Sequence, residues 1–179
     1  MPPTYKLINS SVLTSSASSV EFTSIPATYT DLVFRINAKQ AANYADSGFS
    51  SLRLLAGSSS AYSATSIFTA GSSISVTIAS NQYSGNDSFP VTLAASQSAI
   101  SWGYAEIYIP NYLISQNHPS ITSAGWEADQ TNWNGNSPMV YFSANLFSNT
   151  SALSVVRIAS GLGNFVSGST FYLYGISNA

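Results

Sequence analysis

Apolar and polar residues alternate with a period of two along most of this chain. The alternation is cleanest at residues 74–78 and 105–109, and it recurs at 20–23, 32–38 and 171–174. Successive side chains of a β-strand point to opposite faces, so these runs predict strands with one buried face. β-Branched and aromatic residues dominate the runs, as is usual in strands. The chain must therefore bury its apolar residues by pairing strands and stacking sheets.

Turn-forming residues separate these runs and two others, 139–142 and 154–158. Glycine, serine and asparagine fill the connections, for example at residues 84–87. Short strands at regular spacing with turns between them are typical of an antiparallel sandwich or barrel. We therefore predict an all-β fold, an antiparallel two-sheet sandwich that is jelly-roll-like, in a single domain over residues 1–179. The best candidate for a helical turn is the segment 112–116.

Charged side chains make up 7% of the chain, against about 25% in an ordinary soluble domain. Serine supplies about a fifth of the residues and takes polar positions instead. The net charge is −2, and the cations are dispersed at Lys6, Arg35, Lys39, Arg53 and Arg157. Nucleic acids and anionic membranes are bound by concentrated basic patches, so the sequence predicts neither partner. No run of about 18 apolar residues is present to span a bilayer.

Residues for acid–base, nucleophilic or metal chemistry are scarce. Cysteine is absent, which removes thiolate catalysis and cysteine-based zinc sites together. The single histidine, His118, stands beside Pro119, and no G-x-S-x-G motif supplies a nucleophile for it to activate. Asp87 and Asp129 have too few acidic neighbours for a calcium site. We therefore predict a protein that is not an enzyme and holds no metal or cofactor.

One enzymatic alternative rests on Glu127 and Asp129, two carboxylates near Trp126 and Trp133. Paired carboxylates hydrolyse glycosides, and aromatic rings supply platforms for sugars. Residues two apart on any strand share a face at about 6–7 Å, however, so this spacing carries little information. A solvated acidic loop over residues 127–132 explains the same residues more simply.

The tryptophans are candidates for contact with another molecule. Trp102 lies inside a strand pattern and is expected in the core. Trp126 and Trp133 flank the polar stretch 127–132, where three roles are open: local packing, a protein interface or a glycan site. The candidate interface or glycan contacts are Trp126, Asn132 and Trp133.

Two parts of the chain resemble a known group of proteins. Residues 5–10 read YKLINS and residues 18–33 read SSVEFTSIPATYTDLV, while residues 168–176 read GSTFYLYGI. These segments are similar to the opening and closing segments of a group of tailed-bacteriophage virion proteins, frequent in marine and cyanobacterial phages. The middle of the chain matches that group only in style.

This resemblance implies a virion structural protein, and two roles fit it. One is a capsid decoration, or cement, protein that sits on the capsid surface and binds the major capsid protein. The other is a tail-associated receptor-binding or glycan-binding module, whose partner would be a host glycan. A compact single domain favours decoration, and sparse charge suits a dense array because like-charge repulsion would accumulate over many copies.

Assembly of several copies follows from the same interpretation. Viral shells present local three-fold axes, and cyclic closure buries edge strands, so we expect a homotrimer. Residues 1–7, stiffened by Pro2 and Pro3, are expected to form an N-terminal arm that reaches a neighbouring subunit or the shell. The candidate capsid or subunit contacts are Tyr5, Lys6 and Leu7.

Overall fold

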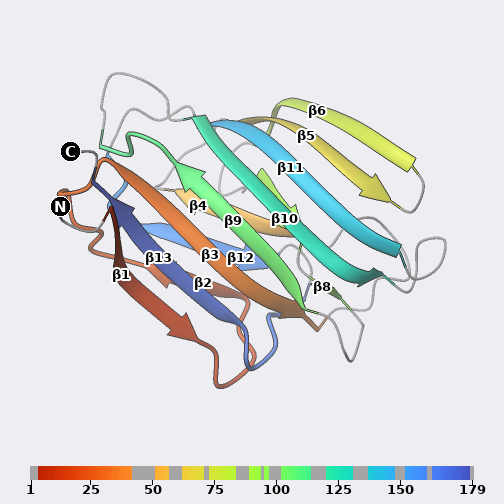
Figure 1. The fold of residues 1–179 in the computed structure, drawn as a ribbon, viewed down its shortest axis with the longest axis horizontal. Coiled ribbons are helices and arrows are strands. Elements are labelled where there is room, and N and C mark those ends of the chain that lie inside the picture. Colours follow the sequence, from red (N-terminus) through yellow and green to blue (C-terminus); the bar gives the residue numbers. More distant parts are fainter. Residues whose placement is uncertain are drawn as a thin grey trace.

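The fold is a sandwich of two β-sheets. The computed structural model describes residues 4–41, 51–56, 62–70, 73–83, 89–93, 95–96, 102–113, 120–130, 137–147, 152–160 and 163–177. These ranges contain thirteen strands and no helix (Figure 1). None of them holds a helix of the length and apolar character that a membrane span needs. The predicted all-β, antiparallel two-sheet sandwich is confirmed.

The larger sheet has nine strands and the smaller one has four. In spatial order the larger sheet consists of β1 (Tyr5–Val12), β13 (Thr170–Ile176), β3 (Asp31–Gln40), β9 (Gly103–Ile109), β10 (Ser120–Gln130), β11 (Ser137–Phe147), β5 (Tyr62–Ala70) and β6 (Ser73–Tyr83), with β8 (Ala95–Ser96) beside β3. The smaller sheet consists of β2 (Ser19–Phe22), β12 (Val156–Ser160), β4 (Ser51–Ala56) and β7 (Phe89–Leu93). Neighbouring strands are antiparallel except β3 and β8, which pair in parallel at Lys39 and Gln40.

The first four strands alternate between the two sheets. β1 and β3 belong to the larger sheet, and β2 and β4 belong to the smaller one. The chain therefore crosses from one sheet to the other at each of its first three connections. Strand β13 returns to a place between β1 and β3, so it lies in the interior of the larger sheet.

The hydrophobic core lies between β3, β9 and β13 on one side and β2 and β12 on the other. Alternate residues of β3 point into it, and Leu32, Phe34 and Ile36 are at most 1% exposed. The rings of Phe22 and Phe34 meet edge to face with centroids 5.5 Å apart. Burial of a side chain of this size contributes about 1.5–3 kcal/mol, so the β3 layer is a major source of stability. The strand expected over residues 32–38 is confirmed.

The position of Trp102 corrects one expectation. Trp102 is 38% exposed, just before β9, and does not belong to the core. Its ring packs at the surface against Gly168, where an added Cβ would lie 3.2 Å from the tip of the indole. The strand pattern around residue 102 was correct from Gly103 onward, but the tryptophan precedes the strand.

Three boundaries also differ from the expectations. The stretch 127–132, expected as a loop, begins as strand, because pairing with β11 carries β10 on to Gln130. The strand expected over 154–158 is Val156–Ser160. Residues 110–113 form a turn without a helix, and the rest of the segment 112–116 lies outside the described residues.

Candidate functional site

The described elements cover one face of the larger sheet. The smaller sheet lies behind it (Figure 1). Strand β7 of the smaller sheet contacts β10 and β11. No described element covers the opposite face, which we call the outer face. Residues of neighbouring strands stand in register across it in one transverse row: Ser10, Tyr172, Arg35, Glu106, Ala124, Phe142, Ile67 and Val76. The outer face is therefore a continuous, broad surface.

An ion pair surrounded by tyrosines occupies the half of the outer face nearest β1. The Arg35 Nε donates a hydrogen bond to the Glu106 Oε2 at 2.9 Å. The Arg35 guanidinium carbon lies 5.7 Å from the ring centroids of both Tyr5 and Tyr174, within the range of cation–π attraction. The cluster of rings on these strands, which we call the tyrosine cluster, consists of Tyr5, Tyr104, Tyr108, Tyr172 and Tyr174.

The rings of the tyrosine cluster pack closely against the sheet and against one another. Val33 faces outward between its register neighbours Tyr108 and Tyr174, yet it is 1% exposed. The rings of Tyr172 and Tyr174 are stacked with centroids 6.5 Å apart. These rings therefore have defined positions before any partner arrives.

A buried carboxylate fixes Tyr108. Asp31 is 3% exposed, and its two oxygens accept hydrogen bonds from the Tyr108 hydroxyl at 2.7 Å and from the backbone N–H of Asn111 at 2.9 Å. Asn111 has a φ of 48°, in the left-handed region that asparagine tolerates better than most residues. Burial and the hydrogen bond to Asp31 raise the pKa of Tyr108 to about 12. Tyr108 therefore stays neutral and keeps its orientation through neutral pH.

Glu106 also influences the groups beside it. Its hydrogen bond to Arg35 raises the pKa of the Arg35 guanidinium above the ordinary value. Burial raises the pKa of Tyr104, and the Glu106 charge adds to that rise. This half of the outer face therefore presents the Arg35–Glu106 ion pair among tyrosine side chains.

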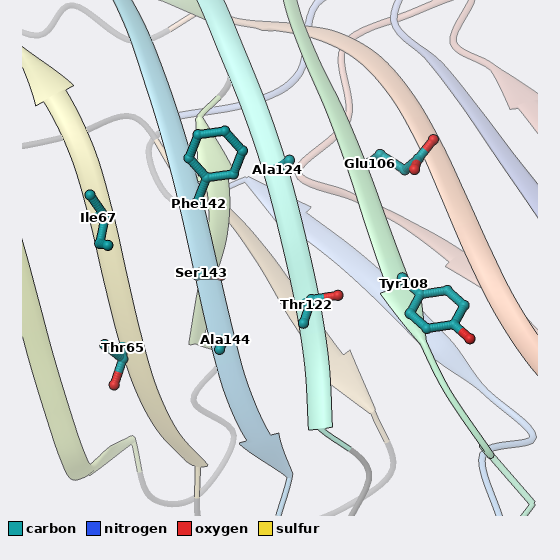
Figure 2. Close-up of a pocket in the computed structure, with 9 residues that line it drawn as sticks. All are labelled: Thr65, Ile67, Glu106, Tyr108, Thr122, Ala124, Phe142, Ser143 and Ala144. Carbon is teal, nitrogen blue, oxygen red and sulfur yellow. The ribbon is translucent and has the colours of Figure 1, made fainter.

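Two shallow hollows lie on the two sides of this ion pair. The first, of about 320 Å³, is lined by Arg35, Ile36, Asn37, Tyr104, Thr170, Tyr172 and Tyr174. The second, of about 460 Å³, runs over β9, β10, β11 and β5. Figure 2 shows that small side chains such as Ala124 and Thr122 form its floor, between Tyr108 and Glu106 on one side and Phe142 on the other.

The chemistry of this surface suits binding. No three of the His, Cys, Asp and Glu side chains in the described ranges come together as metal ligands would. Glu106, the carboxylate at the second hollow, is engaged by Arg35. What the surface offers a partner is aromatic area, hydroxyl and amide hydrogen-bonding groups, and one arginine.

The candidate contacts Tyr5, Lys6 and Leu7 form the start of β1. They pair with Ile176, Gly175 and Tyr174 of β13 and are exposed. Tyr5 belongs to the tyrosine cluster through its contact with Arg35. Of the arm expected over residues 1–7, residues 5–7 are thus paired in the chain's own sheet, and residues 1–3 lie outside the described residues.

The remaining candidates are placed only in part. Trp126 lies in β10, and its backbone is in register with Tyr104 of β9 and Val140 of β11. Asn132 and Trp133 lie outside the described residues, as does His118. Glu127 and Asp129, the carboxylates of the glycosidase alternative, belong to strand β10.

Most members of the tyrosine cluster were not predicted. The signal was present in the alternation, since Tyr104, Glu106 and Tyr108 share one face of a strand, as do Tyr172 and Tyr174. The pattern did not reveal that β3 lies between β9 and β13, and this order alone brings Arg35 among them.

Comparison of the chain with protein-family models, with curated proteins and with solved structures finds no match.

Proposed function

We propose that this chain is a non-enzymatic structural protein of a virion, a decoration (cement) protein that binds the capsid shell of a tailed phage. The viral setting rests on the resemblance of residues 5–10, 18–33 and 168–176 to phage virion proteins. The observation that carries the binding role is the tyrosine cluster around the Arg35–Glu106 pair, held on a broad outer face.

The composition of this surface favours a protein partner. Tyrosine and arginine are enriched in protein interfaces and at their energetic centres. Tyr108 and Arg35 are already held by hydrogen bonds, so binding costs them little conformational entropy. Neighbouring strands lie about 4.8 Å apart, so the eight strands of the path give the face a width of roughly 35 Å. Such a face can span the junction between two shell subunits.

The mechanism is mechanical bridging by many copies. Each copy would contact neighbouring major capsid proteins, and modest contacts would add across the linked shell. The exposed Tyr5 and Leu7 lie at the margin of the tyrosine cluster, where a shell subunit would meet the edge of the sheet. Few charges are present to repel neighbouring copies.

The copy number and position of the chain in purified virions test this proposal. We expect abundance comparable to that of the major capsid protein, by quantitative mass spectrometry, and density on the shell by electron microscopy. A few copies at the tail would move the chain to the tail-associated alternative. Absence from particles of the phage that encodes it would refute the virion role.

Variants test which surface makes the contact. Replacement of Tyr174 by alanine removes one ring beside Arg35 and should weaken binding to undecorated shells by about 10-fold or more, the usual scale of an interface centre. Val12→Ala is the matched control, because Val12 is exposed on the same face at the far end of β1. Equal binding by both variants would exclude the tyrosine cluster as the shell contact.

One observation favours glycan binding as a second candidate. The 320 Å³ hollow combines the rings of Tyr104, Tyr172 and Tyr174 with the polar side chains of Arg35 and Asn37, and sugar sites combine stacking with such hydrogen-bonding groups. A glycan array with wild type, Tyr104→Ala and Trp133→Ala tests this function. Binding lost in Tyr104→Ala assigns the hollow, whereas loss only in Trp133→Ala assigns the candidate site around Trp133.

A further inference from the structure

The 460 Å³ hollow of the outer face has large side chains on two sides and small ones between them. Ala124 of β10 stands in register between Glu106 of β9 and Phe142 of β11. The axes of β9 and β11 are two strand spacings apart, so the floor between them is about 10 Å wide. A floor of this width accommodates one six-membered ring lying flat.

The ring of Phe142 presents one of its faces to the outside. Phe142 is 55% exposed, and Figure 2 shows its ring face-on, lying over the strands. On the opposite side of the floor, Tyr108 is held by its hydrogen bond to Asp31 and also shows a ring face in this view. An aromatic face that lies flat beside small side chains can stack against a flat apolar surface of a ligand.

Hydroxyl groups follow in the next row of the hollow. Two residues further along the strands, Thr122 of β10 and Thr65 of β5 stand in register on either side of Ala144, and both threonines are exposed. Figure 2 shows the Thr122 hydroxyl on the side of Tyr108. Hydroxyls both donate and accept hydrogen bonds. The hollow therefore has an apolar row that contains Phe142 and, beside it, a row that can form hydrogen bonds.

No charged group points into the hollow from the described residues that line it. Glu106 is the one charged residue among them. Its carboxylate accepts a hydrogen bond from Arg35 and is turned toward β3, away from the floor (Figure 2). The hollow thus offers no unpaired charge to balance that of an ionic ligand, whose loss of hydration would be costly. Charge complementarity therefore favours an uncharged ligand.

These features describe the ligand by its chemistry: an uncharged ring with one apolar face and hydrogen-bonding groups along its rim. A hexopyranose has this form, because its C–H groups gather on a face of the ring and its hydroxyls project from the edge. The C–H face would stack on Phe142, while rim hydroxyls exchange hydrogen bonds with Thr122 and Thr65. An acyl chain has no group that could bond to these hydroxyls.

We propose that the 460 Å³ hollow binds a neutral hexopyranose unit of a glycan, with Phe142 as the stacking platform. The volume lies within the range of about 300–1,000 Å³ that is usual for small-ligand sites. Because the hollow is shallow and the ligand small, we expect a Kd on the order of 1 mM for a single sugar. This inference goes beyond the proposed shell binding and does not rest on it.

The hollow is separate from the other candidate surfaces of the outer face. Three strands lie between β11, which carries Phe142, and β13, which carries Tyr174. The 320 Å³ hollow, considered above for a glycan, lies on the other side of the Arg35–Glu106 pair. Substitutions at sites this far apart usually act independently. A chain that binds a sugar and never binds a shell would support this inference and contradict the proposed function.

Saturation-transfer NMR of the full chain is the first test, with the methyl glycosides of glucose, galactose and mannose as probes. We expect transfer to at least one of them, strongest at the C–H protons of one ring face, and a titration that saturates with a Kd on the order of 1 mM. No transfer to any of the three at about 20 mM, well above that Kd, overturns the proposal. Binding confined to an acidic sugar, methyl glucuronide, also overturns it.

A matched pair of variants on β11 locates the sugar. Phe142→Ala removes the stacking face and should weaken binding by about 10-fold, whereas Phe142→Trp keeps an aromatic face and should retain binding. Leu146→Ala is the control, because Leu146 is 41% exposed on the same face of β11 and does not line the hollow. Equal binding by Phe142→Ala and wild type, or equal loss in Leu146→Ala, overturns the assignment.

Two further variants keep the proposal testable whatever the fold of Phe142→Ala. Ala124→Leu fills the floor without removing any group assigned to the sugar, and it should weaken binding by at least about 10-fold. Tyr104→Ala alters only the 320 Å³ hollow and should bind the methyl glycosides as the wild type does. Binding lost in Tyr104→Ala and kept in Ala124→Leu would place the sugar in the 320 Å³ hollow and overturn this inference.

Discussion

The ring of Tyr29 lies against Gly175 so closely that a β-carbon added to the glycine would be 2.3 Å from the ring. Tyr29 belongs to the connection between β2 and β3, and Gly175 lies in β13. The glycine therefore provides space for a ring that closes one end of the core, where Tyr29 packs as a partly buried residue.

Replacement of Gly175 by alanine should destabilise the protein. The methyl group cannot fit unless the Tyr29 ring moves, and such overpacking costs about 1–3 kcal/mol. Urea unfolding of wild type and variant gives the difference. In the double variant with Tyr29→Ala, the alanine at 175 should cost much less than it does alone. An alanine at 175 that is equally costly with and without the ring would contradict the steric explanation.

Removal of the Asp31 carboxylate should also lower the free energy of unfolding. In Asp31→Ala, the Tyr108 hydroxyl and the Asn111 N–H lose a charged acceptor, and each such bond contributes about 1.5–3 kcal/mol. Tyr108→Phe removes only one of these two hydrogen bonds and should lower the free energy of unfolding by less. Equilibrium unfolding of both variants should rank them in that order, and the reverse order would show that Asp31 is not the anchor of this turn.

The stability contributed by Tyr108 should disappear at alkaline pH. Folding raises its pKa from about 10 to about 12, so the folded state disfavours the phenolate. The contribution is fully present below pH 10 and is lost as the pH rises from about 10 to about 12. The difference in unfolding free energy between wild type and Tyr108→Phe should shrink over this window. A difference that stays constant to pH 12 would mean that Tyr108 titrates normally.

The Arg35–Glu106 pair should contribute little to stability. Both side chains are more than 40% exposed, and exposed ion pairs contribute about 0.2–1 kcal/mol. A double-mutant cycle with Arg35→Ala and Glu106→Ala should give a coupling in this range that decreases with added salt. A coupling of several kcal/mol, insensitive to salt, would instead make the pair a structural element of the sheet.

Strong alternation made some strands predictable from sequence. Residues 32–38 and 171–174 carry large apolar residues at every second position, and both runs are strands of the larger sheet. β10 was missed because Ala124, Gly125 and the serines around them mark neither face clearly. Its strand conformation comes from hydrogen bonding to β9 and β11, which no local pattern contains.

The candidate site was predictable only at its margin. Tyr5 was singled out from the sequence, and it does contact Arg35. The partners of Arg35 come from strands far apart in the chain, so their meeting depends on strand order. Strand β11 buries Tyr141, Ser143 and Asn145 and exposes Phe142 and Leu146. The sequence could not reveal this, since an alternating run predicts two faces but not which of them is buried.

The position of β13 between β1 and β3 has a consequence for how the chain folds. Leu173 pairs with Phe34 across most of the length of the chain, so the best-packed part of the core cannot form from local segments. Sheets built on such distant pairings usually form in milliseconds to seconds, since a long loop must close before the contact stabilises it. The β10–β11 hairpin pairs close neighbours and can form earlier. Strand β3 therefore has no β13 neighbour until the two distant ends of the chain meet, and an unpaired apolar strand is prone to misassembly before that step.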